Sequence, residues 1–180
     1  ASVGHADLNA INIDRRGKSI VQFRTNANFT RTGHGDILGR VDVGEIMLEN
    51  KGGRYEVGDI IITSHSADNQ YMARLKSQFA DAEYIGTASF ADFIEDLQEV
   101  TVRKEMPALY PEKEFKWNGN SYGLDFVCHN IQNVLAFAAP GLYIENNTHI
   151  KADIDSHGGF QAEMLSKRVA FKRNYMKGVS

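Results

Sequence analysis

The chain has 180 residues, of which 42% are hydrophobic and 24% are charged, and its net charge is −3. These values are typical of one globular domain, which we place at residues 1–180, and they exclude a long disordered chain. They also lack the strongly basic balance of most free nucleic-acid-binding proteins. The single cysteine, Cys128, excludes an internal disulfide, and its apolar neighbours predict a buried side chain.

The N-terminal residues 1–5 have neither the basic region nor the apolar region of a secretory signal peptide. The longest apolar stretch, residues 134–139, is too short to span a bilayer. We therefore expect a cytoplasmic or virion protein that is not secreted through a signal peptide and has no membrane partner.

The first half of the chain predicts strands joined by tight turns. Over residues 17–30, apolar and polar side chains alternate, as expected of a half-buried strand. The alternation over residues 36–49 changes phase at Gly44, which predicts a bulge or bend there. The glycine pair that follows predicts a hairpin turn into strands at 54–57 and 60–62.

One helix is expected at about residues 90–99. Apolar residues recur at helical spacing from Phe90 to Leu97, which gives the segment one face for a core. Ser89 is a suitable N-cap residue, and Asp92 follows it at the spacing of a capping box.

The second half of the chain predicts two hairpins. Residues 114–117 are expected to pair with 122–128 across a turn of the Asn-Gly type. Residues 141–145 are expected to pair with 148–153 across an Asn-Asn turn.

Two further segments can form either a helix or a strand. Residues 67–82 show both patterns, and their alanine, lysine and glutamine content favours a helix. Residues 160–175 favour neither state. Together these expectations give an α+β fold, with an antiparallel β-sheet or partial barrel, a helix at about 90–99, and one or two further helices at 67–82 and 160–175.

Three pairs of histidine and aspartate lie at turns next to predicted strands. Imidazole and carboxylate bind divalent metals, so convergence of these pairs would make a metal-dependent hydrolase of a phosphate ester or nucleotide. No His-Glu-x-x-His motif or cysteine cluster accompanies them, and surface histidines beside turn aspartates are the simpler explanation. The candidate ligands are His34, Asp36, His65, Asp68, Asp155 and His157.

Charge is distributed unevenly along the chain. The two ends are basic and the expected helix at 90–99 is acidic, so basic residues of one copy could contact the acidic helix of a neighbour. A solvated surface explains the same pattern. The interface candidates are Asp92, Glu95 and Asp96 on the acidic side and Lys167, Arg168, Lys172 and Arg173 on the basic side.

The basic ends also suggest a small nucleic-acid-binding module. Cationic side chains would contact phosphates, and aromatic residues would stack on bases. The strand spacing of these aromatic residues equally suits a protein core. They are Phe23, Phe29, Trp117 and Tyr122.

No catalytic motif is specific enough to indicate an enzyme, and no cofactor is expected. The sequence therefore favours a non-enzymatic structural protein that assembles into a ring, tube or shell, of the virion or phage-tail type. Its partners would be other copies of itself and other particle proteins, which would pair along open strand edges. The metal-dependent hydrolase and the nucleic-acid-binding module remain the alternatives.

Overall fold

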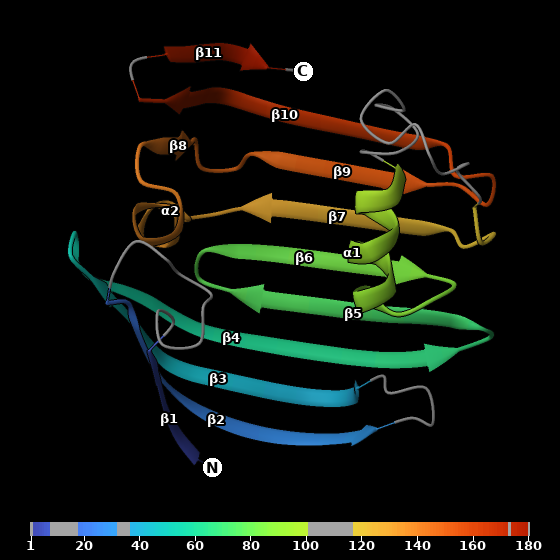
Figure 1. Ribbon diagram of the computed structural model, residues 1–180, viewed down its shortest axis with the longest axis horizontal. Helices are drawn as coiled ribbons and strands as arrows, with labels where there is room; N and C mark the ends of the chain where they lie inside the picture. The colour runs from blue at the N-terminus through green and yellow to red at the C-terminus, as the bar shows by residue number, and fades with distance from the viewer. Residues whose placement is uncertain (1, 8–17, 32–36, 101–116, 173, 180) are drawn as a thin grey trace.

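The computed structural model describes residues 2–7, 18–31, 37–100, 117–172 and 174–179. This part of the chain forms one antiparallel sheet of eleven strands with two helices, α1 (Phe90–Gln98) and α2 (Gln132–Ala138) (Figure 1). The strands are β1 (Ser2–Asp7), β2 (Ile20–Arg31), β3 (Ile37–Asn50), β4 (Gly53–Ala67), β5 (Gln70–Ser77), β6 (Ala80–Gly86), β7 (Tyr122–Cys128), β8 (Leu142–Ile144), β9 (His149–Ile154), β10 (Phe160–Phe171) and β11 (Asn174–Val179).

The sheet is largely a meander, in which each strand pairs with the next strand along the chain. The spatial order is β1-β2-β3-β4-β5-β6-β7-β9-β10-β11, and β8 pairs with β10. Helix α1 is inserted between β6 and β7, and α2 lies between β7 and β8. As a result, the first and last strands lie at opposite edges of the sheet (Figure 1).

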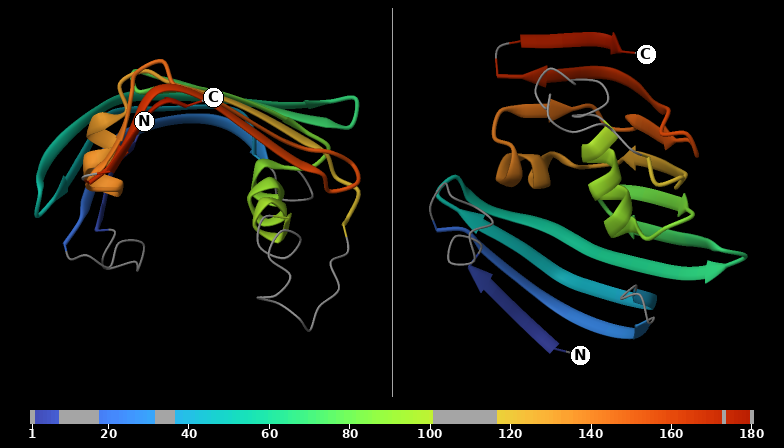
Figure 2. Two further views of the ribbon diagram at one scale, coloured as in Figure 1. Left: turned by 90° about the horizontal axis from the view of Figure 1, so that it is seen from above. Right: turned by 45° about the vertical axis from the view of Figure 1, so that its right-hand side comes forward.

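The sheet bends along its strands into an arch, and both helices lie beneath it on the concave side (Figure 2). We call the side that carries the helices the trough face and the other side the charged face. Side chains alternate between the two faces along each strand. On β6, for example, Tyr84 packs beneath α1 on the trough face, whereas Glu83 lies on the charged face.

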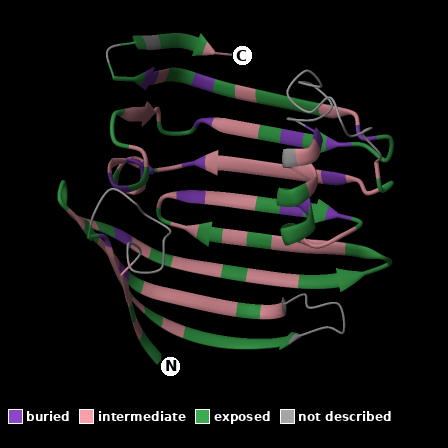
Figure 3. Cartoon of the chain, viewed as in Figure 1, coloured by how far each residue is buried: buried purple, intermediate pink, exposed green. Residues whose placement is uncertain are grey.

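The main core lies where α1 crosses the trough face. Phe93 of α1 is 1% exposed, and its ring lies 5.7 Å from that of Tyr84 and 5.4 Å from that of Tyr122. The predicted capping box is confirmed: the Ser89 hydroxyl accepts a hydrogen bond from the Asp92 N–H at 3.2 Å, and the Ser89 N–H donates to the Asp92 carboxylate at 3.0 Å. Away from the helices, long runs of each strand are only half-buried or exposed (Figure 3).

The predicted bulge at Gly44 is also confirmed. The pairing of β3 with β4 shifts between Val43 and Ile46, so that two residues of β3 oppose one residue of β4. Glu45 takes a φ of 54°, and its N–H donates to Asp59 Oδ1 at 3.0 Å. The bulge accounts for the change of phase in the sequence, because it returns apolar residues to the same face on both sides of it.

The expected α+β class is wrong, because strands make up 65% of the described residues and helices only 12%, which is an all-β-like fold. The helix favoured at 67–82 is absent: β4 ends at Ala67, and the segment continues as β5 and β6. The segment 160–175 likewise forms strand, in β10 and the start of β11. In both segments, pairing with neighbouring strands outweighs local helix propensity.

Of the two predicted hairpins of the second half, one is replaced by another pairing and the other falls largely outside the described residues. Strand β7 pairs with β6 on one side and with β9 on the other. Of residues 114–117, only Trp117 lies within the described residues. The Asn-Asn turn does form, with Asn147 at a φ of 62°, but β8 pairs with β10 and not with β9.

The apolar stretch at 134–139 forms most of α2, a helix that strand and turn patterns did not predict. Leu135 of this helix packs with Ile131 and the predicted buried thiol of Cys128, which is 0% exposed. Among the described residues, no helix is both long and apolar enough to cross a membrane.

Candidate functional site

An apolar floor runs along the trough face, in the space between α1 and α2. One residue from each of eight strands contributes to it, and printed cross-strand pairs place these residues side by side. The flanking rows on the same face, from Thr25 to Cys128 and from Phe29 to Ala162, contain no charged residue. The trough floor consists of Ala27, Val41, Ile62, Leu75, Ala82, Phe126, Ile150 and Met164.

Helix α1 forms an apolar wall beside this floor. On its outer side, Asp96 accepts hydrogen bonds from Asn118 at 2.9 Å and from the Tyr122 hydroxyl, both near the start of β7. Successive helical residues turn by about 100°, so Ile94 lies about 160° around the helix from Asp96 and faces the trough. Ile94 and Phe90 are 40% and 47% exposed.

The same contacts change the acidity of Tyr122. Burial raises the pKa of its phenol, and the hydrogen bond to Asp96 raises it further. The hydrogen bond from the Tyr122 hydroxyl to the Asp96 carboxylate fixes α1 to β7. This hydroxyl therefore serves as a structural donor, and a general acid would need a pKa closer to neutral.

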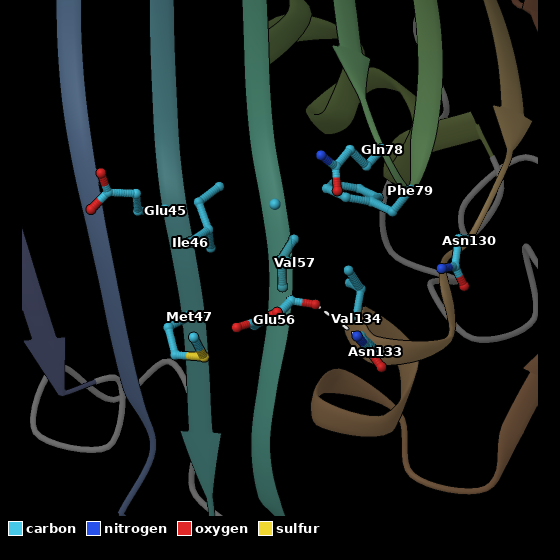
Figure 4. A pocket seen from close by; sticks show the side chains of 11 residues that line it. Glu45, Ile46, Met47, Glu56, Val57, Gln78, Phe79, Asn130, Asn133 and Val134 are labelled. Atoms are coloured by element: carbon cyan, nitrogen blue, oxygen red, sulfur yellow. Dashed lines mark hydrogen bonds between the residues drawn. The ribbon is translucent and has the colours of Figure 1, made fainter.

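On the opposite side of the trough, a cavity of about 580 Å³ lies between α2 and the ends of β3 and β4 (Figure 4). Pairing of β4 with β5 begins only at Ile60, so the first part of β4 has an edge that β5 does not cover. Asn133 Nδ2 of α2 donates to the carbonyl of Glu56 there at 2.7 Å. The lining is mixed, since Val57 and Phe79 lie among amide and carboxylate side chains.

The two outer edges of the sheet are open in the part of the chain that the structure describes. No described strand pairs with the outer side of β1 or of β11. Val3 on β1 is 79% exposed, and Met176 on β11 is 58% exposed. Each edge therefore has an outer side that no described strand covers, together with an exposed apolar side chain.

The charged face is covered by cross-strand ion pairs. Arg74 on β5 pairs with Glu83 on β6 at 2.8 Å, and Asp125 on β7 pairs with Lys151 of β9 at 3.7 Å and contacts His149. A hollow of about 520 Å³ lies on this face, over strands β5, β6, β7 and β9. Exposed pairs of this kind add little stability each, but they keep this face hydrated while the trough face stays apolar.

The structure does not bring the described metal-ligand candidates together. His65 lies near the end of β4 and Asp68 in the turn after it, whereas Asp155 and His157 lie in the turn after β9, with β5, β6 and β7 between them. Asp155 Oδ1 instead accepts the N–H groups of His157 and Gly159 at 2.7 and 2.9 Å, which shapes that turn. Within the described ranges, no three His, Cys, Asp or Glu residues could hold a metal ion.

The remaining two metal candidates, His34 and Asp36, lie outside the described residues, as does Arg173 of the proposed interface. The other basic interface candidates, Lys167, Arg168 and Lys172, are exposed on and after β10. The contact between copies that we expect of them stays a prediction.

The acidic interface candidates differ in what they contact. Asp92 forms the helix cap and Asp96 holds β7, so both carboxylates have partners within the chain. Glu95 is exposed. Of the aromatic residues considered for base stacking, Trp117 and Tyr122 belong to the core under α1.

The sequence patterns did not predict the trough floor, although apolar and polar residues alternate in each of its strands. Alternation indicates that a strand has two different faces, but it does not say which residues of distant strands stand in one row. The comparisons give no further indication: no protein-family model, no curated protein and no solved structure matches this chain.

Proposed function

We propose that this protein is a non-enzymatic structural subunit that assembles with other copies of itself into a ring, tube or shell. The observation that carries the proposal is the pair of sheet edges β1 and β11, each six residues long, whose outer sides pair with no other strand among the described residues. An open edge is a template for pairing with another chain, and monomeric proteins usually block it with proline, charge or a covering segment.

The strand directions suit head-to-tail addition of copies. Ten strands lie on the path from β1 to β11, and every neighbouring pair along it is antiparallel. The two edge strands therefore run in opposite directions. A second copy in the same orientation would place its β11 antiparallel to β1 of the first, and the alternation would continue across the junction.

The edges contain few of the residues that block pairing. Neither β1 nor β11 contains proline, each contains one Asp or Lys residue, Asp7 or Lys177, and Val3 and Met176 expose apolar surface on them. Head-to-tail contacts of this type close into a ring when the rotation between copies permits it, and otherwise extend as a filament or tube.

The proposal is tested by placing a charge on each edge separately. We expect the wild-type chain to elute well above its mass of 20.1 kDa in size-exclusion chromatography with light scattering. Val3→Lys and Met176→Lys should each shift it towards the monomer, because a lysine would be desolvated at the new junction.

Ile85→Lys is the matched control, because Ile85 is 44% exposed but lies on β6, which is paired with β5 on one side and with β7 on the other. It should assemble like the wild type. A wild-type chain that stays monomeric at high concentration, or edge variants that assemble normally, would overturn the proposal.

A further inference from the structure

The hollow on the charged face contains a glycine in the interior of a central strand. Gly123 lies in β7 and pairs with Ile85 of β6 on one side and with Asp153 of β9 on the other, and all three line the hollow. The φ of Gly123 is not positive, so the backbone conformation does not require glycine here. Glycine inside a strand costs stability and often marks a place where a ligand approaches the backbone closely.

The missing side chain of Gly123 opens the floor of the hollow. A Cβ atom at this position would lie 3.4 Å from Ile85 Cγ2 and 3.2 Å from Asp153 Oδ1, so it would take the space between these two side chains. Met72 of β5 continues the floor on the other side of Ile85, with which it pairs. Ile85 is 44% exposed, so the cavity of about 520 Å³ has apolar surface at its bottom, as small-molecule sites of this size do.

The charges around this floor leave one carboxylate without a partner. Arg74 pairs with Glu83 at 2.8 Å, and Lys151 pairs with Asp125 at 3.7 Å, so these four charges offset one another. Of the three described carboxylates that line the hollow, Asp153 alone forms no ion pair with a described residue. The hollow therefore combines an apolar floor with one uncompensated negative charge beside it.

This combination argues against several classes of ligand. An anion would face Asp153 and would have to separate the two cations from their own carboxylates. His65, which lines the far end of the hollow, lies four strand spacings or about 19 Å from Asp153 and does not offset its charge. A peptide strand cannot add at this place, because β6 and β7 are paired on both sides.

We propose that the hollow binds a protonated arylalkylamine, a small molecule with a flat apolar ring and an ammonium group. The ring lies over Gly123, against Ile85 and Met72, and the ammonium group lies at Asp153. A flat ring suits a gap that one missing side chain opens. Binding removes the exposed surface of Ile85 from water, and the ring shields the ion pair from solvent, which strengthens it. This inference goes beyond self-assembly and does not depend on it.

The ligand class is tested with two probes of similar shape. The full chain is titrated at pH 8 with 2-phenylethylamine and with the uncharged 2-phenylethanol, by isothermal titration calorimetry and by saturation-transfer difference NMR. We expect saturable binding of the amine that weakens as salt is added, because salt screens the contact with Asp153. The alcohol should bind about threefold or more weakly than the amine, because it has no charge to pair.

The site is tested with two variants and a matched control. Gly123→Ala should weaken binding of the amine by about tenfold while the chain still folds, since alanine suits a strand better than glycine does. Asp153→Asn keeps the shape of the side chain and should weaken binding by about three- to tenfold. Glu163→Gln is the control, because Glu163 is exposed on the same face, opposite Lys151, but does not line the hollow. It should bind the amine like the wild type.

Three outcomes would overturn the proposal: no saturable binding of the amine to the wild type, equal affinity for the alcohol, or equal loss in Asp153→Asn and Glu163→Gln. Far-UV circular dichroism shows whether Gly123→Ala folds, and the comparison of Asp153→Asn with its control stands without it. The Val3→Lys edge variant should bind the amine like the wild type. Ile85→Lys should lose the amine and still assemble, so either proposal can fail alone.

Discussion

At the scale of single residues, the hydroxyl of Tyr122 is a contact that joins a helix to a strand. It donates to Asp96, which also accepts from Asn118 and Asn120, and this cluster joins α1 to the start of β7. We expect Tyr122→Phe to lower the free energy of unfolding by about 1–3 kcal/mol, because the carboxylate loses a donor in a partly buried site. Urea unfolding measures the loss.

The control for this substitution is Tyr143→Phe. The Tyr143 hydroxyl donates to Glu145 at 3.0 Å near the surface, so we expect a change of only about 0.5 kcal/mol or less. Equal effects of the two substitutions would contradict the structural role assigned to the Tyr122 hydroxyl.

Burial also determines the behaviour of Cys128. It raises the pKa of the thiol above its ordinary value of 9.0, because the thiolate would lose its hydration. Below pH 9 the thiol is protonated in both the folded and the unfolded chain. As the pH rises above 9, the unfolded chain loses this proton first, so the free energy of unfolding should fall.

Two measurements check this expectation. The native thiol should react with a thiol reagent at pH 8 only as fast as the chain unfolds. In Cys128→Ala, the free energy of unfolding should fall less steeply above pH 9, because no thiol titrates at this position. Rapid labelling of the native chain would show that Cys128 is accessible.

At the scale of elements, the N-terminus of α1 depends on the Ser89 and Asp92 capping box. The helix spans only Phe90–Gln98, and a helix this short has little stability without its cap and its packing. We expect Ser89→Ala to lower the free energy of unfolding by about 1 kcal/mol, because the Asp92 N–H loses its acceptor. Ser89→Thr, which keeps the hydroxyl, should lose less, and an equal loss in both variants would place the effect elsewhere.

At the scale of the whole molecule, the single-layered sheet leaves much apolar surface half-buried. If copies assemble along their edges, the folded chain is stabilised by association, and its thermal midpoint should rise with protein concentration. Differential scanning calorimetry over a hundredfold range of concentration measures this shift. The Met176→Lys variant should show a smaller dependence, and a constant midpoint for the wild type would argue against association of the folded state.

Several features follow from the sequence because they depend on neighbouring residues alone. The cap at Ser89, the bulge at Gly44 and the strand at 17–30 each have a short-range signature, and each is present in the structure. The burial of Cys128 follows from its apolar neighbours in the same way. The metal and interface candidates were found by residue type only, and type does not indicate whether distant turns converge.

What only the tertiary structure decided is which segments pair and which face is covered. Residues 67–82 fit both a helix pattern and a strand pattern. They form strands because β4 and β7, which lie on either side of β5 and β6, pair with them. The trough exists because eight separate strands place their apolar side chains in one register while two helices stand apart on that face. Alternation within each strand determined that one side would be apolar, but the assembly of those sides into a continuous floor required pairing between residues as distant in the sequence as Ala82 and Phe126, which no local pattern encodes.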